Sequence, residues 1–273
     1  MKYDPIKKVF GDIVRSAPFL RILFYKLLGL MFLREWHVKR ALRQLLGGRK
    51  EPFAIYDAGS GFGQYAYYMA MHFPVATISG IDLKDEQVAD CSRFFQQVGL
   101  NQCTFAVEDL TLIRHENRFD FILSVDVMEH IAEDVLVFKN FYRSLRKDGM
   151  LLINTPSNLG GSDAHAPDDA SFIEEHARNG YGYDEIRQKL ESVGFVVESL
   201  RYTYGPWGDR YWRFAIKYPM LMVNVSKALL ILLPFYYLVV LPFTLPMMWL
   251  DYIADNKAGT GLNVVARKKT NHE

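Results

Sequence analysis

The chain has 273 residues, half of them apolar and 14% aromatic, which is enough for one large domain or a domain with a sizeable appendage. Its formal net charge of +1 gives no reason to expect a nucleic acid as partner. Cys91 and Cys103 provide neither a disulfide framework nor a metal-binding spacing, so we expect two small buried residues in a reducing compartment.

The first 50 residues form a basic segment with twelve Lys or Arg side chains against three acidic ones, which suggests an anionic surface as partner. We do not expect a secretory signal, because no small-residue cleavage site follows the apolar part.

The apolar run from Pro18 to Leu33 is interrupted by Arg21 and Lys26, which is typical of an interfacial helix. A helix lying over the core or the active site is the alternative. A second helix is expected from Glu35 to Leu46.

The next segment combines a strand, a glycine turn and a helix. Phe53 to Tyr56 is an apolar run that predicts a buried strand, and the turn after it carries Gly59, Gly61 and Gly63. Glycine lets a backbone turn sharply and approach a ligand closely. The start of the following helix presents free N–H groups. This combination indicates a nucleotide-type pocket in an open α/β sheet.

The spacing of the glycines limits which class of nucleotide-type cofactor the turn can bind. A dinucleotide fingerprint has glycines at its first, third and sixth positions, whereas Gln64 occupies the sixth position here, which disfavours a nicotinamide-dependent oxidoreductase. The pattern D-x-G-x-G-x-G from Asp57 to Gly63 instead resembles motif I of the class I S-adenosylmethionine-dependent methyltransferases. The resemblance implies that Asp57 faces the methionine end of the cofactor.

Short apolar runs then alternate with helical patterns. Strands are expected at 53–57, 77–82, 103–108, 119–125 and 150–154, and helices at 62–73, 85–98 and 133–146. Such alternation predicts a parallel sheet with right-handed crossovers. Ligands of these sheets bind beyond the carboxyl ends of the strands.

Acidic residues stand at those ends. Asp82, followed by Leu83, lies about twenty residues beyond the glycine turn, where an acid can accept hydrogen bonds from both ribose hydroxyls. Asp109 and Leu110 follow the third strand and can hold adenine, and Asp126 follows the fourth. The spacing is similar to that of the methyltransferases, which implies S-adenosylmethionine as cofactor.

The resemblance covers residues 51–201 and a short C-terminal strand. It implies a Rossmann-like, seven-stranded, mostly parallel sheet with helices on both faces, whose last two strands, at 194–200 and 261–267, form an antiparallel hairpin. We therefore divide the chain into N-terminal basic amphipathic helices (1–50), a methyltransferase domain (51–201 and 259–269) and a hydrophobic insertion (202–258).

The segment from Asp126 to His130 resembles the Glu-x-x-Glu-His motif of the ubiquinone-biosynthesis O-methyltransferases, in which two acids and a histidine bind a divalent metal. Asp126 departs from that motif because it replaces the first glutamate. The resemblance implies a cation such as Mg²⁺ on Asp126, Glu129 and His130, which would lower the pKa of an acceptor hydroxyl. Without a metal, His130 could act as general base beside Glu129. A purely structural role for the pair is the third possibility.

A long polar loop follows the fifth strand and lasts to Tyr183. Loops of this length in a compact domain are usually functional or disordered. Related enzymes build the acceptor pocket at this position, and His176 and Tyr181 are our further candidates for catalytic residues.

The insertion indicates the substrate class. Residues 202–216 mix aromatic and basic side chains as at a membrane interface. The 23 residues from Ala228 to Leu250 carry no charge and would form a helix roughly 35 Å long. One crossing is excluded because the flanking strands must pair in one sheet. Pro234, Pro242 and Pro246 are expected to break the segment. We predict a re-entrant or in-plane helical hairpin in one leaflet; a hydrophobic subdomain or an oligomer interface is the alternative.

Together these features predict a methyltransferase that acts on a lipid-like or other hydrophobic acceptor, with oxygen as the expected acceptor atom. The enzyme would lie on the cytoplasmic side of a membrane as a peripheral or monotopic protein. The alternatives are an N-methyltransferase of a phospholipid or small molecule, and a catalytically inactive cofactor-binding module recruited to the membrane.

Overall fold

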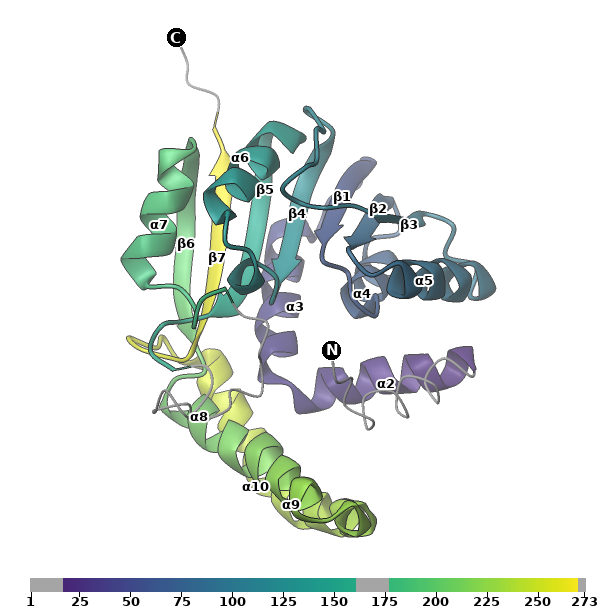
Figure 1. The fold of residues 1–273 in the computed structure, drawn as a ribbon, viewed down its shortest axis with the longest axis vertical. Coiled ribbons are helices and arrows are strands. Elements are labelled where there is room, and N and C mark those ends of the chain that lie inside the picture. The colour runs from purple at the N-terminus through teal and green to yellow at the C-terminus, as the bar shows by residue number, and fades with distance from the viewer. Residues whose placement is uncertain (1–16, 161–176, 270–273) are drawn as a thin grey trace.

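A computed structural model describes residues 17–160 and 177–269 of the chain (Figure 1). Seven strands form one sheet in the order β3-β2-β1-β4-β5-β7-β6. They are β1 (Phe53–Ala58), β2 (Ala76–Asp82), β3 (Cys103–Val107), β4 (Phe119–Val125), β5 (Leu145–Pro156), β6 (Phe195–Thr203) and β7 (Gly261–Lys268). All neighbours are parallel except β7, which runs antiparallel to both β5 and β6. The predicted fold is confirmed.

Helices cover both faces of the sheet because successive side chains of a buried strand point to opposite sides. On one face Ile55 and Leu123 pack with α3 (Leu33–Leu46), α4 (Gln64–His72) and α5 (Asp85–Gln97). On the other face Tyr56 and Ile122 pack with α6 (Asp134–Ser144) and α7 (Tyr183–Ser192). Cys91 and Cys103 are free and buried in the first of these clusters, as expected.

The boundary between α6 and β5 differs from expectation. The helix predicted to reach residue 146 ends at Ser144, and β5 begins at Leu145 instead of residue 150. Leu145 is extended and pairs with Phe119, and the register then shifts before the next pair. The irregular start of β5 contains Asp148 with a φ of +59°. Local helical periodicity could not reveal this pairing with a strand that lies 26 residues earlier.

The segment between β6 and β7 folds into two antiparallel helical arms, which we call the insertion hairpin (residues 206–253). The outgoing arm contains α8 (Pro206–Trp212), the π-helical η2 (Arg213–Lys217) and α9 (Tyr218–Val225), and the returning arm contains the 3₁₀ segment η3 (Lys227–Leu232) and α10 (Leu233–Ile253). The hydroxyls of Tyr236 and Tyr237 donate to the carbonyls of Phe214 (2.6 Å) and Ala215 (3.0 Å) across the arms. The hairpin projects from the end of the sheet at which the parallel strands finish (Figure 1).

The prolines of this segment do not break it as predicted, because α10 is continuous with Pro242 and Pro246 inside it. Pro234 lies in the first turn of α10, where the missing N–H would have no helical partner in any case. Pro242 and Pro246 are four residues apart and exposed, so they share the outer face of the helix. The opposite face, with Thr244 and Met248, stays buried and packed.

Asp251 ties the hairpin to the body of the protein. Its carboxylate is fully buried and accepts hydrogen bonds from the backbone amides of Tyr204 (3.2 Å) and Gly208 (3.1 Å). Asn256 Nδ2 donates to Asp251 Oδ2 at 3.3 Å, and His37 Nε2 lies 3.2 Å from Asp251 Oδ1. A buried carboxylate is stable only when such donors replace the lost water, so the base of the hairpin is held by one residue with partners on several elements.

Replacing Asp251 by alanine should lower the free energy of unfolding by about 3 kcal/mol, because two backbone amides lose their acceptor in a buried site. Urea unfolding in mild detergent would measure the change. Asp255→Ala, at an exposed position four residues later, is the matched control and should change little. Equal losses in the two variants would contradict this role for Asp251.

Candidate active site

The glycine turn is fixed to the end of the neighbouring strand. The backbone amides of Gly59 and Ser60 donate to the carbonyl of Ile81 at 3.0 and 2.7 Å. Gly59 has a φ of +83°, and a Cβ at this position would collide with the side chain of Val127. Glycine is therefore required for both conformation and space. Gly63 also has a positive φ and precedes the first residue of α4.

Gly61 lies at the open side of the turn. Its φ is +51°, and a Cβ built on it meets no atom within 4 Å. Its amide donates to Asp82 Oδ2 at 3.1 Å, and the amide of Lys84 donates to Oδ1 at 3.0 Å. Each carboxylate oxygen can accept a further bond, so Asp82 remains able to bind ribose hydroxyls. Leu83 beside it is 68% exposed and offers an apolar surface at the same edge.

Asp57 is buried at the end of β1, and its Oδ2 has no hydrogen-bond partner among the described residues. Burial and, to a smaller extent, the charge of Asp82 raise the pKa of Asp57 to about 7, although a hydrogen bond from the backbone of Ala66 opposes both effects. A cation placed at Oδ2 would satisfy this carboxylate. The amino group of a methionine moiety is such a cation, in agreement with the role expected for Asp57.

Asp109 and Leu110 follow β3. Asp109 Oδ1 accepts from the amide (2.8 Å) and hydroxyl (2.7 Å) of Thr111, which fixes the direction of the carboxylate. Leu110 is buried, and the amide of Asn140 on α6 donates to its carbonyl at 2.9 Å. Thr111 therefore holds Asp109 and Asn140 holds Leu110, as rigid binding residues require.

Arg34 on α3 is a site residue that the sequence analysis missed. It forms an ion pair with Asp126, whose φ of +51° is a left-handed conformation unusual outside glycine. Its backbone amide donates to the hydroxyl of Tyr204 at 3.0 Å, and its buried Nε finds no hydrogen-bond partner in the part of the chain that the structure describes. A guanidinium at this place can bind a carboxylate. The only signal in the sequence was that Arg34 lies in the basic segment before the glycine turn. Because that segment holds twelve Lys or Arg residues, the signal could not single out Arg34.

Several buried polar atoms near these strand ends lack hydrogen-bond partners among the described residues. They are Arg34 Nε, Asp57 Oδ2, Ser60 Oγ, Ser124 Oγ and Asn154 Nδ2. Unsatisfied groups of this kind are rare in native proteins and indicate a polar ligand when they gather. Acids for an amino group and for ribose, and a cation for a carboxylate, match the chemistry of S-adenosylmethionine. The residues present fit the predicted cofactor.

The predicted metal site does not form. Among the residues that the structure describes, no group of three His, Cys, Asp or Glu side chains could hold a metal ion. Asp126 is paired with Arg34, while Glu129 is buried and accepts from the hydroxyl of Thr155 at 3.1 Å. His130 is exposed. The short 3₁₀ turn η1 (Met128–His130) sends Glu129 inward and His130 outward, so the three side chains cannot share one ion.

Glu129 and His130 still stand at the end of β4, as expected for residues near an acceptor. Burial raises the pKa of Glu129, and hydrogen bonding to its own backbone and to Thr155 and the charge of His130 offset this in part. The carbonyl of Glu129 accepts from the amides of Ala177 (3.0 Å) and Arg178 (3.2 Å). Glu129 therefore also positions the loop after β5, and the catalytic role of both residues stays a prediction.

Tyr181 is not at the acceptor site. It is fully buried, and its hydroxyl lies 3.1 Å from the carbonyl of Met128 and 2.9 Å from Asp134 Oδ2. Arg178 and Lys189 bind the same carboxylate, so Tyr181 belongs to a buried ionic cluster between α6 and α7. The prediction of a catalytic tyrosine is wrong, because the end of the loop enters the core. His176 lies outside the described residues.

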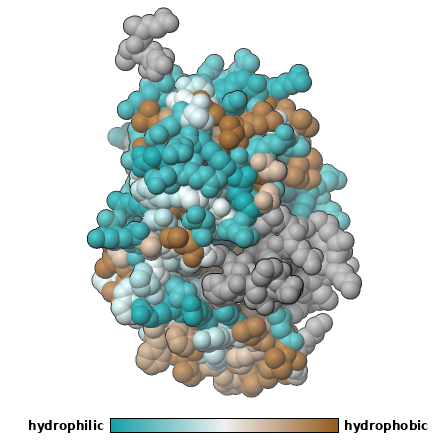
Figure 2. All heavy atoms as spheres, turned by 60° about the vertical axis from the view of Figure 1, so that its left-hand side comes forward, coloured by the Kyte–Doolittle hydropathy of each residue, from teal (hydrophilic) through white to brown (hydrophobic). Residues whose placement is uncertain are grey.

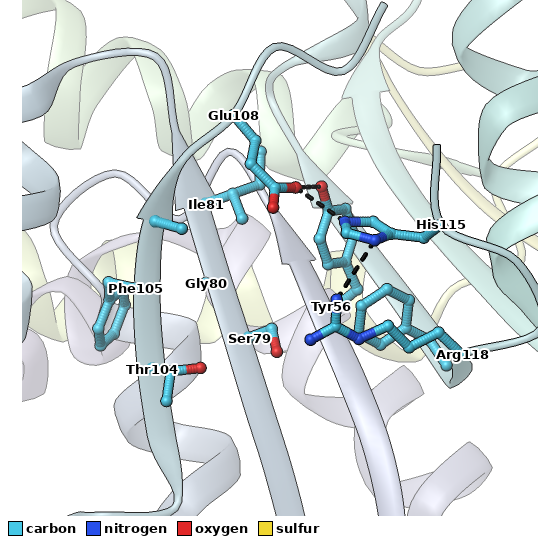
Figure 3. A pocket seen from close by; sticks show the side chains of 11 residues that line it. Tyr56, Ser79, Gly80, Ile81, Thr104, Phe105, Glu108, His115 and Arg118 are labelled. Carbon is cyan, nitrogen blue, oxygen red and sulfur yellow. Dashed lines mark hydrogen bonds and ion pairs between the residues drawn. The ribbon is translucent and has the colours of Figure 1, made fainter. Parts of the chain in front are cut away.

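A small cavity of about 90 Å³ lies beside β1, β2 and β3 (Figure 3). Glu108 accepts from the hydroxyl of Tyr56 (2.7 Å) and interacts with His115 (3.0 Å), which in turn contacts Arg118 (3.3 Å). Ligand pockets usually enclose about 300–1,000 Å³, so this space is too small for a nucleoside. The contacts of Tyr56 and His115 with Glu108 instead hold the residue that directly precedes Asp109.

Residues 50–194, more than half of the chain, match the family model described as a methyltransferase domain. Phosphoethanolamine N-methyltransferase 3 of Arabidopsis thaliana is 30% identical over 144 residues, which is 52% of this chain and 28% of the relative. Malonyl-(acyl-carrier protein) O-methyltransferase of Bacillus cereus is 24% identical over 147 residues, 52% of this chain and 54% of the relative. The chain thus spans much less than the full length of these relatives.

Solved structures share the fold. The chain superposes on Haemonchus contortus phosphoethanolamine N-methyltransferase 2 in complex with S-adenosyl-L-methionine with a TM-score of 0.63 at 19% identity. The superposition covers 96% of this chain and 60% of that chain. At this identity the likeness concerns the fold.

Asp82→Ala should abolish measurable binding of S-adenosylhomocysteine, because it removes the acceptor for the ribose and the bonds that order Gly61 and Lys84. Isothermal titration calorimetry would measure binding. Asp85→Ala, at the exposed first residue of α5, is the matched control and should bind like the wild type. Undiminished heat from Asp82→Ala would contradict the assigned cofactor site.

Asp57→Asn should change the pH dependence of stability. With a pKa raised from 3.8 to about 7, the folded protein keeps a proton that the unfolded chain releases, so this contribution is present at low pH and is lost as pH rises toward 7. Between about pH 5 and about pH 8 the wild type should lose roughly 3 kcal/mol relative to the variant. Urea unfolding of both proteins measures this difference, and parallel pH profiles would refute it.

Proposed function

Because the chain belongs to the family of methyltransferase domains, we propose that it transfers a methyl group from S-adenosylmethionine to a lipid-like acceptor at a membrane surface. The family confirms the predicted enzyme class, a class I S-adenosylmethionine-dependent methyltransferase. The acceptor, its reacting atom and the place of action form the proposal.

The exposed insertion hairpin carries this proposal. Its apolar side chains face outward along α10; Leu238, for example, is 75% exposed, and Phe235, Val239 and Phe243 are similar. Hydrophobic residues gather over this end of the molecule (Figure 2). The segment Ala228–Ile253 is long and apolar enough to cross a membrane, and only 6% of its most apolar 18-residue stretch is buried inside the protein. Large contiguous apolar surfaces of this kind mark sites of membrane or protein association.

The topology supports entry and exit on the same side of the bilayer. The hairpin leaves from β6 and returns to β7, and these strands are antiparallel neighbours. Both arms therefore begin and end at one edge of the sheet (Figure 1). A hairpin held in this way can dip into one leaflet while the sheet stays in water, which agrees with a monotopic protein.

The base of the hairpin adjoins the site. Asp251 accepts from the amide of Tyr204, the hydroxyl of Tyr204 accepts from the amide of Arg34, and Arg34 pairs with Asp126 at the end of β4. A molecule anchored by its tail in the bilayer beside the hairpin could thus place its polar end near the strand ends. The cofactor would enter from water.

The reaction needs alignment, exclusion of water and removal of a proton. When bound, S-adenosylmethionine would supply an electrophilic methyl group on a positively charged sulfur. Asp57, Asp82 and Arg34 would fix the direction of approach. His130, exposed just beyond β4, would receive the proton of the acceptor, and buried Glu129 would hold the turn that carries it.

Nitrogen is a second candidate for the acceptor atom. The sequence resemblance implies oxygen, whereas relatives of the chain are named as phosphoethanolamine N-methyltransferases. An amine-bearing lipid headgroup would agree both with the membrane proposal and with the N-methyltransferase names of these relatives. Incubation with labelled cofactor and separate hydroxyl-bearing and amine-bearing lipids, followed by mass spectrometry, would distinguish the two atoms. Methylation of water-soluble acceptors alone would overturn the lipid proposal.

The triple variant Phe235→Asn, Leu238→Asn and Phe243→Asn should lose vesicle binding at least tenfold, since it removes three of the most exposed apolar side chains from α10. Binding of S-adenosylhomocysteine should stay unchanged. Vesicle co-sedimentation and calorimetry measure the two effects. If the variant still binds vesicles and methylates lipids like the wild type, the hairpin is not the membrane anchor.

His130→Asn should lower turnover by about 10²-fold or more if His130 accepts the proton, without weakening cofactor binding. His72→Asn is the matched control because His72 is an exposed histidine at the end of α4, where its ring contacts the carbonyl of Tyr68. Initial rates with a lipid acceptor over a range of pH would show the loss. Unchanged rates would remove His130 from the mechanism.

A further inference from the structure

The helix α2 (Pro18–Met31) lies across the end of the sheet where β1, β2 and β3 finish (Figure 1). Its inner face contacts the glycine turn. Its outer face is an apolar stripe of Phe19, Leu23, Leu27 and Leu30, which are 42–67% exposed. The spacing of four, four and three residues places these side chains on one side of the helix. One helix therefore connects an apolar surface that the other described residues leave exposed with the cofactor site.

The connection on the inner face is made by Arg21, which is 1% exposed. Its guanidinium donates to the carbonyl of Phe62 at 2.7 Å, to Asp90 Oδ2 at 2.6 Å and to the hydroxyl of Tyr25 at 2.6 Å. Tyr25 in turn donates to the same Phe62 carbonyl. Phe62 is the residue between Gly61 and Gly63, so two side chains of α2 hold the central peptide of the glycine turn.

Holding this peptide matters for ligand binding. Gly61 and Gly63 both have positive φ values, and in this conformation the Gly61 amide donates to Asp82. Without Arg21 and Tyr25, a turn with three glycines would sample many other conformations. Ordering it again would then reduce the affinity for the cofactor. Whatever stabilises α2 in its place therefore strengthens cofactor binding.

We propose that the apolar stripe of α2 docks on an anionic lipid bilayer and that this docking, through Arg21 and Tyr25, tightens the binding of the cofactor. The idea rests on the proposed membrane function and adds a regulation of the same site. The bilayer becomes a positive effector, so that the enzyme holds its cofactor most firmly where its acceptor is found.

Two observations favour a bilayer as the occupant of the stripe. Lys26 is exposed between Leu23 and Leu27 on the same face, where its ammonium group can reach anionic headgroups while the leucines enter the apolar layer. The insertion hairpin, with its own exposed apolar surface, lies at the same end of the sheet (Figure 1). A single flat bilayer can meet both elements, with α2 lying in the interface and the hairpin entering the leaflet.

The test compares affinities for S-adenosylhomocysteine by calorimetry with and without vesicles of equal parts phosphatidylcholine and phosphatidylglycerol. Anionic vesicles should tighten binding by the wild type about tenfold, within the usual range of coupling energies. Because coupling is reciprocal, saturating S-adenosylhomocysteine should raise the partition of the protein onto vesicles by the same factor.

Two double variants separate the steps. Leu23→Gln with Leu27→Gln should abolish the vesicle effect while leaving affinity without vesicles unchanged; Met71→Gln with Leu136→Gln, at exposed apolar positions on α4 and α6, is its matched control. Arg21→Lys with Tyr25→Phe should retain vesicle binding through the hairpin but lose the tightening. Circular dichroism and thermal melting verify that each variant is folded.

Several outcomes would overturn the inference. If vesicles bind and lipids are methylated but the affinity for S-adenosylhomocysteine does not change, the coupling is wrong and the proposed function stands. If the Leu23 and Leu27 variant responds like the wild type, the stripe does not dock. If sedimentation shows a dimer that this variant dissociates, the stripe meets a second copy of the chain. If the wild type binds no vesicles, the membrane proposal and the inference both fall.

Discussion

Carboxylates crowded at the ends of parallel strands impose the main constraint on this protein. Asp57, Asp82, Asp109 and Asp126 stand at four neighbouring positions along one edge of the sheet. Like charges so close together, one of them fully buried, oppose folding unless donors or cations surround them. Backbone amides satisfy Asp82, Thr111 satisfies Asp109 and Arg34 satisfies Asp126, whereas one oxygen of Asp57 has no partner within the described ranges 17–160 and 177–269. The positive charge of the cofactor supplies the partner that this oxygen of Asp57 lacks.

Elements outside the sheet serve this edge. The glycine turn provides amides to it, α2 holds the turn through Arg21, and α3 contributes Arg34. The insertion hairpin reaches the same edge through Asp251 and Tyr204. Tyr204 has a φ of +55°, a strained conformation for a bulky side chain that persists because its backbone is bound at both ends. Polar contacts thus link the cofactor site to the elements that carry the two apolar surfaces.

These contacts give the proposed function a physical basis, because they connect the apolar surfaces to the cofactor site. The two exposed apolar surfaces, on α2 and on α10, belong to separate elements, and both are tied by buried polar contacts to residues at the strand ends. Apolar association alone would fasten the protein to a surface without affecting its chemistry. Polar contacts transmit position because they require specific distances and directions. A membrane-bound methyltransferase that senses its surface could be assembled from these parts.

The sequence by itself determined the order of strands and helices, the glycine turn and the acids that follow it, because two-residue and 3.6-residue periodicities and glycine spacing are local properties. Only the tertiary structure decided which distant side chains meet. The pairing of Arg34 with Asp126, the burial of Tyr181 and the divergence of Glu129 from His130 depend on contacts between residues far apart or on the direction of one short turn. The continuity of α10 through Pro242 and Pro246 likewise depends on which face of the helix packs, and no local pattern encodes that choice.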